Sequence, residues 1–64
     1  MDEMWFVELN ANYIDPDSSV VRFAFVTSCD DQYVYGFYWR PDSRRRSGFR
    51  MTLARLESFV QVQQ

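Results

Sequence analysis

The segment Tyr33–Trp39, which reads YVYGFYW, limits the fold more than any other part of the chain. Aromatic and β-branched residues favour the pleated surface of a strand, so we predict a strand over about residues 32–40. Successive side chains of a strand point to opposite faces, which places bulky apolar groups on both faces of the sheet. The rest of the chain must therefore cover two apolar surfaces.

Two further strands precede this segment. Alternation of apolar and polar residues predicts a first strand over about residues 4–12. The segment Asp15–Ser18 predicts a turn, because Pro16 presets its own φ and the Asp and Ser side chains can bond to nearby backbone. A second strand, rich in β-branched and aromatic residues, is predicted over about residues 19–27.

The C-terminal third is predicted to form a loop and a helix. Residues 41–48 are polar, basic and free of apolar side chains, which indicates an exposed loop before a short fourth strand at residues 49–51. Thr52 resembles a helix N-cap, with Met51 packing on Leu56 as a hydrophobic staple, so we predict a helix over about residues 53–62. Alternation near the C-terminus supports a competing interpretation, in which strands continue over residues 49–62.

These elements predict one small α+β domain over residues 1–64: an antiparallel sheet of three to four strands packed on one C-terminal helix. The alternative is an SH3-like small β-barrel closed around a single aromatic core. One cysteine and no histidine among 64 residues exclude an internal disulfide and an ordinary zinc site. We expect no metal and no cofactor, and stability must come from apolar packing or self-association.

The register of the second and third strands decides which side chains share a face. A hairpin loop of two or four residues places Phe23 and Phe25 with Val34, Gly36 and Tyr38. A loop of three or five residues gathers the large rings on one side of the sheet: Phe23, Phe25, Tyr35, Phe37 and Trp39. In both registers one helix of about ten residues leaves apolar area uncovered, and such a patch marks an interface.

Arginine supplies all seven basic residues of the chain, and four of them fall within Arg44–Arg50. Arginine and aromatic residues are the types enriched at protein interfaces. We therefore predict a partner-binding site, with these members: Tyr35, Phe37, Trp39, Arg44, Arg45, Arg46 and Arg50. Three consecutive arginines cannot all face one way, and the net charge of −2 does not attract nucleic acid over long range.

Catalysis is not expected, because the chain has no histidine, no lysine and no glycine-rich phosphate loop. The thiol of Cys29 lies beside Asp30 and Asp31, whose charges oppose its activation. We predict instead a non-catalytic protein that occludes or modulates a larger protein, such as a phage or mobile-element inhibitor in counter-defence. A nucleic-acid-binding module is the alternative, and a homodimer is a further expectation.

The aromatic strand, the basic turn and the pairs Phe49–Arg50 and Arg55–Leu56 resemble the C-terminal strands of the WYL domains of bacterial regulators. That resemblance implies a barrel and nucleic-acid binding. The two pairs stand farther apart here than in that pattern, and the chain is shorter than the usual domain. With no secretory signal and no membrane-spanning run, we expect a cytoplasmic protein, in the host cytoplasm if a phage encodes it.

Overall fold

A computed structural model describes residues 6–62 of the chain. Five strands form one antiparallel sheet in the order β4-β3-β2-β1-β5. Their bounds are β1 Ala11–Ile14, β2 Phe23–Cys29, β3 Tyr33–Trp39, β4 Arg46–Thr52 and β5 Val60–Gln61, and a single helical turn, α1 Leu53–Leu56, connects β4 to β5. The fold is thus mostly β, and within the described residues no helix is long enough to cross a membrane.

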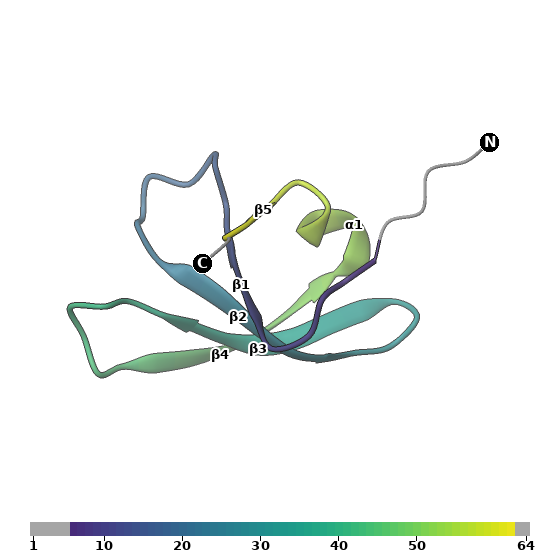
Figure 1. Cartoon of the computed structure of the whole chain (residues 1–64), viewed down its shortest axis with the longest axis horizontal. Coiled ribbons are helices and arrows are strands. Elements are labelled where there is room, and N and C mark those ends of the chain that lie inside the picture. The colour runs from purple at the N-terminus through teal and green to yellow at the C-terminus, as the bar shows by residue number, and fades with distance from the viewer. Residues whose placement is uncertain (1–5, 63–64) are drawn as a thin grey trace.

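Strands β2, β3 and β4 form a long platform, and β1, α1 and β5 all lie on one side of it (Figure 1). The sheet is open, since within residues 6–62 the edge strands β4 and β5 do not pair with each other. The structure therefore does not show the closed barrel that was the alternative expectation. None of the described elements lies over the other side of the platform (Figure 1).

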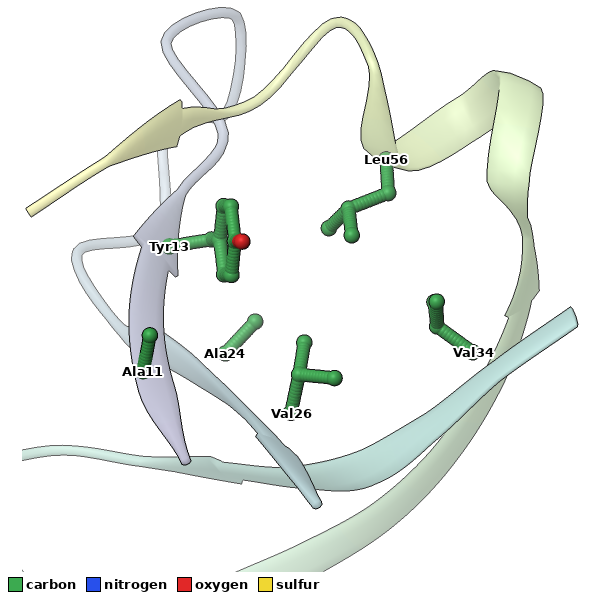
Figure 2. Packing of buried hydrophobic residues seen from close by; sticks show 6 residues of the cluster. All are labelled: Ala11, Tyr13, Ala24, Val26, Val34 and Leu56. Carbon is green, nitrogen blue, oxygen red and sulfur yellow. The ribbon is translucent and has the colours of Figure 1, made fainter. Parts of the chain in front are cut away.

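The core lies between the platform and the elements above it. Tyr13, Val26, Val34 and Leu56 converge there from three strands and α1 (Figure 2). Leu56, Val26 and Val34 are fully buried, and the smaller Ala11 and Ala24 complete the buried set. The Tyr13 hydroxyl accepts a hydrogen bond from the Glu8 backbone N–H at 3.0 Å, which ties the segment before β1 to this core.

The first strand begins later than predicted. Residues 4 and 5 lie outside the described part of the chain, and residues 6–10 are not extended into a strand. Asn10 adopts a φ of 58°, a left-handed conformation that Asn tolerates better than most residues and that interrupts an extended chain. Its backbone N–H donates to the Val26 carbonyl at 2.7 Å, and β1 starts at the next residue.

The turn between β1 and β2 forms where the sequence predicts it. Asp15 accepts from two backbone N–H groups, from Asp17 at its side chain (3.0 Å) and from Ser18 at its carbonyl (3.2 Å). The second strand then starts at Phe23, four residues beyond the predicted Ser19. Residues 19–22 complete the connection instead.

The predicted helix over residues 53–62 is wrong in length. Thr52 caps it as predicted, because its hydroxyl accepts from the Arg55 backbone N–H at 3.1 Å, but the helix ends after Leu56. Val60 and Gln61 pair with Ile14 and Tyr13 as β5. This pairing satisfies backbone N–H and C=O groups on the edge of β1 that a longer helix would leave unpaired. It agrees in part with the competing interpretation, in which strands continue over residues 49–62.

The loop predicted over residues 41–48 is shorter than expected, because β4 starts at Arg46 and pairs with β3 along its whole length. Backbone pairing with β3, whose residues favour a strand, outweighs the weak strand preference of the polar residues Arg46 and Ser47. The fourth strand is therefore a main element of the sheet rather than a short extension at residues 49–51.

A β-bulge sets the register of β2 against β3. Cys29 pairs with Val34, and the four residues 30–33 stand between these two partners, which is the even spacing that would place Phe23 and Phe25 with Val34. The ladder then shifts between Val26 and Ser28, and Thr27 has no partner opposite it. Beyond the bulge Phe25 pairs with Phe37 and Phe23 pairs with Trp39. One extra residue thus gathers the large rings on one face.

Gly36 occupies the position of closest approach between β3 and its neighbours. A Cβ built there would lie 1.9 Å from the Phe25 carbonyl oxygen and 3.1 Å from the Phe49 ring. At Gly48 the nearest atom to such a Cβ is 3.9 Å away, which is an ordinary contact. The two glycines of the chain therefore differ sharply in what they tolerate.

We expect Gly36→Ala to destabilise the protein by about 1–3 kcal/mol, the usual cost of overpacking. Gly48→Ala is the matched control, and we expect it to be neutral or slightly stabilising because alanine loses less backbone entropy on folding. Urea unfolding followed by circular dichroism measures both changes. Equal stabilities of the two variants would contradict the close contact at Gly36.

Candidate functional site

The face of β2, β3 and β4 that points away from Leu56 is the candidate site, and we call it the ring face. The strand register and the alternation of side chains define its members. They include Phe23 and Phe25 from β2, Tyr33, Tyr35, Phe37 and Trp39 from β3, Arg46, Gly48 and Arg50 from β4, and Asn12 from β1. The six rings are partly exposed, so the ring face presents apolar surface to solvent.

Two pairs of rings cross from β2 to β3 on this face. Phe23 stacks on Trp39 with ring centroids 4.8 Å apart, and Phe25 lies against Phe37 at 5.3 Å. Each pair joins residues that are directly opposite in the ladder, the arrangement in which cross-strand aromatic contacts stabilise a sheet. The contacts restrict the rotamers of all four rings, so the apolar surface is rigid before any partner arrives.

Asn12 fixes the orientation of the Trp39 indole. The indole Nε1–H donates to Asn12 Oδ1 at 2.7 Å, across the width of β2. The amide of Asn12 keeps its own N–H groups for further donation. A polar side chain thereby positions the largest ring of the ring face.

Arg46 lies above the same rings. Its guanidinium carbon is 5.5 Å from the centroid of Trp39 and 5.9 Å from that of Phe37, at the outer range of cation–π attraction. Its Nη1 donates to the carbonyl oxygens of Arg45 at 3.1 Å and Ser43 at 3.4 Å. These backbone acceptors hold the cation in place beside the rings.

At the other end of the ring face, the carboxylate of Asp30 accepts hydrogen bonds from three neighbouring donors. Asp30 accepts from the backbone N–H groups of Gln32 (2.8 Å) and Tyr33 (2.7 Å) and from the Tyr35 hydroxyl (2.7 Å). These bonds favour the ionised form and lower the pKa of Asp30, and donation to Asp30 raises the pKa of Tyr35. Arg50 lies 4.6 Å from the centroid of the Tyr33 ring.

Five of the seven predicted site residues lie together on the ring face: Tyr35, Phe37, Trp39, Arg46 and Arg50. Arg44 and Arg45 lie in the β3–β4 loop, and Arg45 lines a separate depression with Arg22 and Tyr38. Tyr38 belongs to the core face of β3, where it packs against Phe49. Of the arginine triplet, only Arg46 thus lies on a strand of the ring face.

The predicted site omitted several residues that the fold brings to the same side. Phe23 and Phe25 could have been found from the register argument, whereas Asn12 carries no signal in the sequence. Ile14 and Val60 pair across β1 and β5, with exposed fractions of 37% and 57%. Ile14 is two residues from Asn12 on the same strand, so this apolar pair extends the ring face towards the β5 edge.

Other chemistry is not assembled in the described part of the chain. Within residues 6–62 no group of three or more His, Cys, Asp or Glu side chains is placed to hold a metal ion. Cys29 is exposed at the end of β2. Two acids outside the ring face are paired with arginines, Asp15 with Arg55 at 2.9 Å and Asp42 with Arg40 at 3.0 Å.

Comparison of the chain with protein-family models, curated proteins and solved structures finds no match. The resemblance to WYL domains therefore receives no support from these comparisons.

The lowered pKa of Asp30 predicts a dependence of stability on pH. A carboxyl with a lowered folded-state pKa stabilises the fold above its unfolded-state pKa of about 3.9, and that contribution is lost as the pH falls towards the folded-state value. We expect the stability of Asp30→Asn to fall less steeply than that of the wild type as the pH is lowered below about 4. Asp31→Asn should keep the steep fall of the wild type, and the midpoint of thermal unfolding at a series of pH values measures both variants. An identical fall in the wild type and Asp30→Asn would contradict this role.

Proposed function

We propose that this chain is a non-catalytic interaction protein that binds a larger protein through the ring face and thereby occludes or modulates it. The observation that carries the proposal is a rigid, partly exposed aromatic surface that no described element covers and that arginines border. Contiguous exposed apolar patches of this kind mark interaction sites.

The composition and rigidity of the ring face both support this function. Tryptophan, tyrosine and arginine are the residue types that dominate the binding energy of protein interfaces. The stacked rings and the hydrogen-bonded Trp39 are already ordered, so little side-chain entropy remains to be lost on binding. A partner that covers the rings gains the full hydrophobic contribution of their exposed area.

A nucleic-acid-binding module is the second candidate, because arginines beside exposed rings also suit single strands. Stacking of bases, however, needs an open ring surface. Phe23 stacks on Trp39, and Arg46 lies over Trp39 as well. Arg50 lies over Tyr33, and only Arg46 of the arginine triplet belongs to the ring face. These contacts, together with the net charge of −2, favour a protein partner.

We further propose an origin and a place of action. A small binding domain with an acidic balance and one cysteine fits an accessory inhibitor of a phage or mobile element, acting in the host cytoplasm, for example in counter-defence. Affinity capture of the tagged chain from that cytoplasm, with and without nuclease, tests the proposal. Recovery of one nuclease-resistant protein supports it, and loss of all captured material on nuclease treatment overturns it.

Trp39→Ala should weaken binding to the captured protein more than the combined change of Arg44, Arg45 and Arg46 to alanine. Loss of a buried aromatic anchor costs about 2 kcal/mol or more. Arg44 and Arg45 lie in the β3–β4 loop at the margin of the ring face, where charges mainly change the association rate, so Arg46 supplies most of the loss in the triple variant. Isothermal titration calorimetry of variants with native circular dichroism measures the ranking. Val21→Ala, which alters a side chain 79% exposed and outside the ring face, is the control and should bind normally.

The opposite ranking would contradict the proposal, above all if it came with tight binding to DNA or RNA. Phosphate contacts release counterions, so affinity for nucleic acid falls steeply as salt concentration rises. A steep salt dependence that the triple arginine change flattens would identify nucleic acid as the partner.

A further inference from the structure

A shallow depression of about 230 Å³ lies within the ring face. Its walls are Phe25, Phe37 and Trp39, and its polar lining consists of Asn12 and Arg46. We call it the anchor pocket. The three rings are fixed by cross-strand contacts and by the bond from Trp39 to Asn12, so the shape exists without a ligand.

Both polar groups of the anchor pocket present hydrogen-bond donors. Trp39 occupies Asn12 Oδ1, which leaves the amide N–H groups of Asn12 to donate. Arg46 uses Nη1 for two backbone carbonyls, which leaves donors at Nε and Nη2. Within residues 6–62 these remaining groups have no recorded protein acceptor. The anchor pocket therefore combines apolar walls with a cation and a neutral donor.

We propose that the anchor pocket binds an apolar side chain that stands next to a carboxylate on the partner protein. This inference rests on the proposed function. The rings accept the apolar group, and the Arg46 guanidinium and the Asn12 amide donate to the carboxylate oxygens. Hydrogen bonds between arginine and carboxylate are about twice as strong as neutral ones, so the acidic group adds specificity to the apolar contact.

Charge complementarity selects an acidic partner over a second copy of this chain. Arg46 and Arg50 are the charged members of the ring face, and the neighbouring Asp30 is already bound by three donors. Two ring faces in contact would place four guanidinium groups against one another, and like charges across an interface cost several kcal/mol. A partner surface with Asp or Glu beside Leu or Phe has the opposite charge pattern.

The test uses the whole protein and short blocked peptides as probes. One peptide carries leucine next to glutamate, a second carries glutamine instead of the glutamate, and a third carries serine instead of the leucine. Chemical-shift changes of the Trp39 indole and the Asn12 amide follow each titration. We expect saturable shifts with the leucine–glutamate peptide at millimolar concentration and at least about tenfold weaker binding of the other two, the effect of losing a hydrogen bond to a charged group or a buried apolar side chain.

Asn12→Asp is the sharpest variant, because aspartate keeps the acceptor for Trp39 while it replaces a donor with a negative charge. We expect it to weaken the leucine–glutamate peptide about tenfold or more and to leave the serine–glutamate peptide without measurable binding. Arg46→Gln should have a similar effect, while the loop variant Arg44→Gln should change affinity less than about twofold. An unchanged fold in each variant is checked by circular dichroism.

Equal binding of the glutamate and glutamine peptides, absence of binding to any peptide, or stronger shifts with a single-stranded oligonucleotide would overturn the inference. These results are distinct from a failure of the proposed function. A captured protein that is lost with Trp39→Ala but retained with Asn12→Asp and Arg46→Gln would support binding of a protein by the ring face. It would contradict recognition of a carboxylate by the anchor pocket. If the wild type captures no protein, the proposed function itself is contradicted.

Discussion

The packing of Leu56 against the concave face of the sheet is the contact on which the other features depend. A chain of 64 residues can bury only about 60% of its unfolded surface, so it completes one core rather than two. Leu56 comes from outside the sheet and fills the space between β1 and β3, with Tyr13 and Val34 on either side (Figure 2). Once that face is covered, no element within residues 6–62 is left to bury the opposite face of the platform.

The small size of the buried side chains explains why the aromatic residues lie elsewhere. Tyr13 is the one aromatic residue in the buried set of the described chain, beside two alanines, two valines and a leucine. The α1 turn comes close to the sheet over these small residues, since larger ones would hold it away. Apart from Tyr38, the rings of β2 and β3 therefore occupy the other face, where their cross-strand contacts stabilise the sheet and also shape its surface.

Local chemistry explains which elements the sequence could predict. The turn at Asp15, the cap at Thr52 and the strand Tyr33–Trp39 depend on residues close together in the chain, and all three are confirmed. The helix beyond Leu56 was wrong, because the free edge of β1 is available to β5 only after the sheet has formed. The same limit applies to the candidate site: the rings are visible in the sequence, but the pairing of Asn12 with Trp39 joins residues 27 positions apart.

The bulge at Thr27 decides which side chains of β2 lie on the ring face and which lie in the core. If every residue were kept and the ladder ran without the bulge, the register of Cys29 and Val34 would turn Phe23 and Phe25 towards Leu56. Removal of Thr27 itself would leave Val26 opposite Gly36 and keep both faces as they are. Conservative exchanges at the same positions would keep every side chain on its face. Relatives of this chain under selection for a changed partner can therefore alter the ring face gradually by substitution, whereas loss of the bulge with every residue kept would exchange surface and core together.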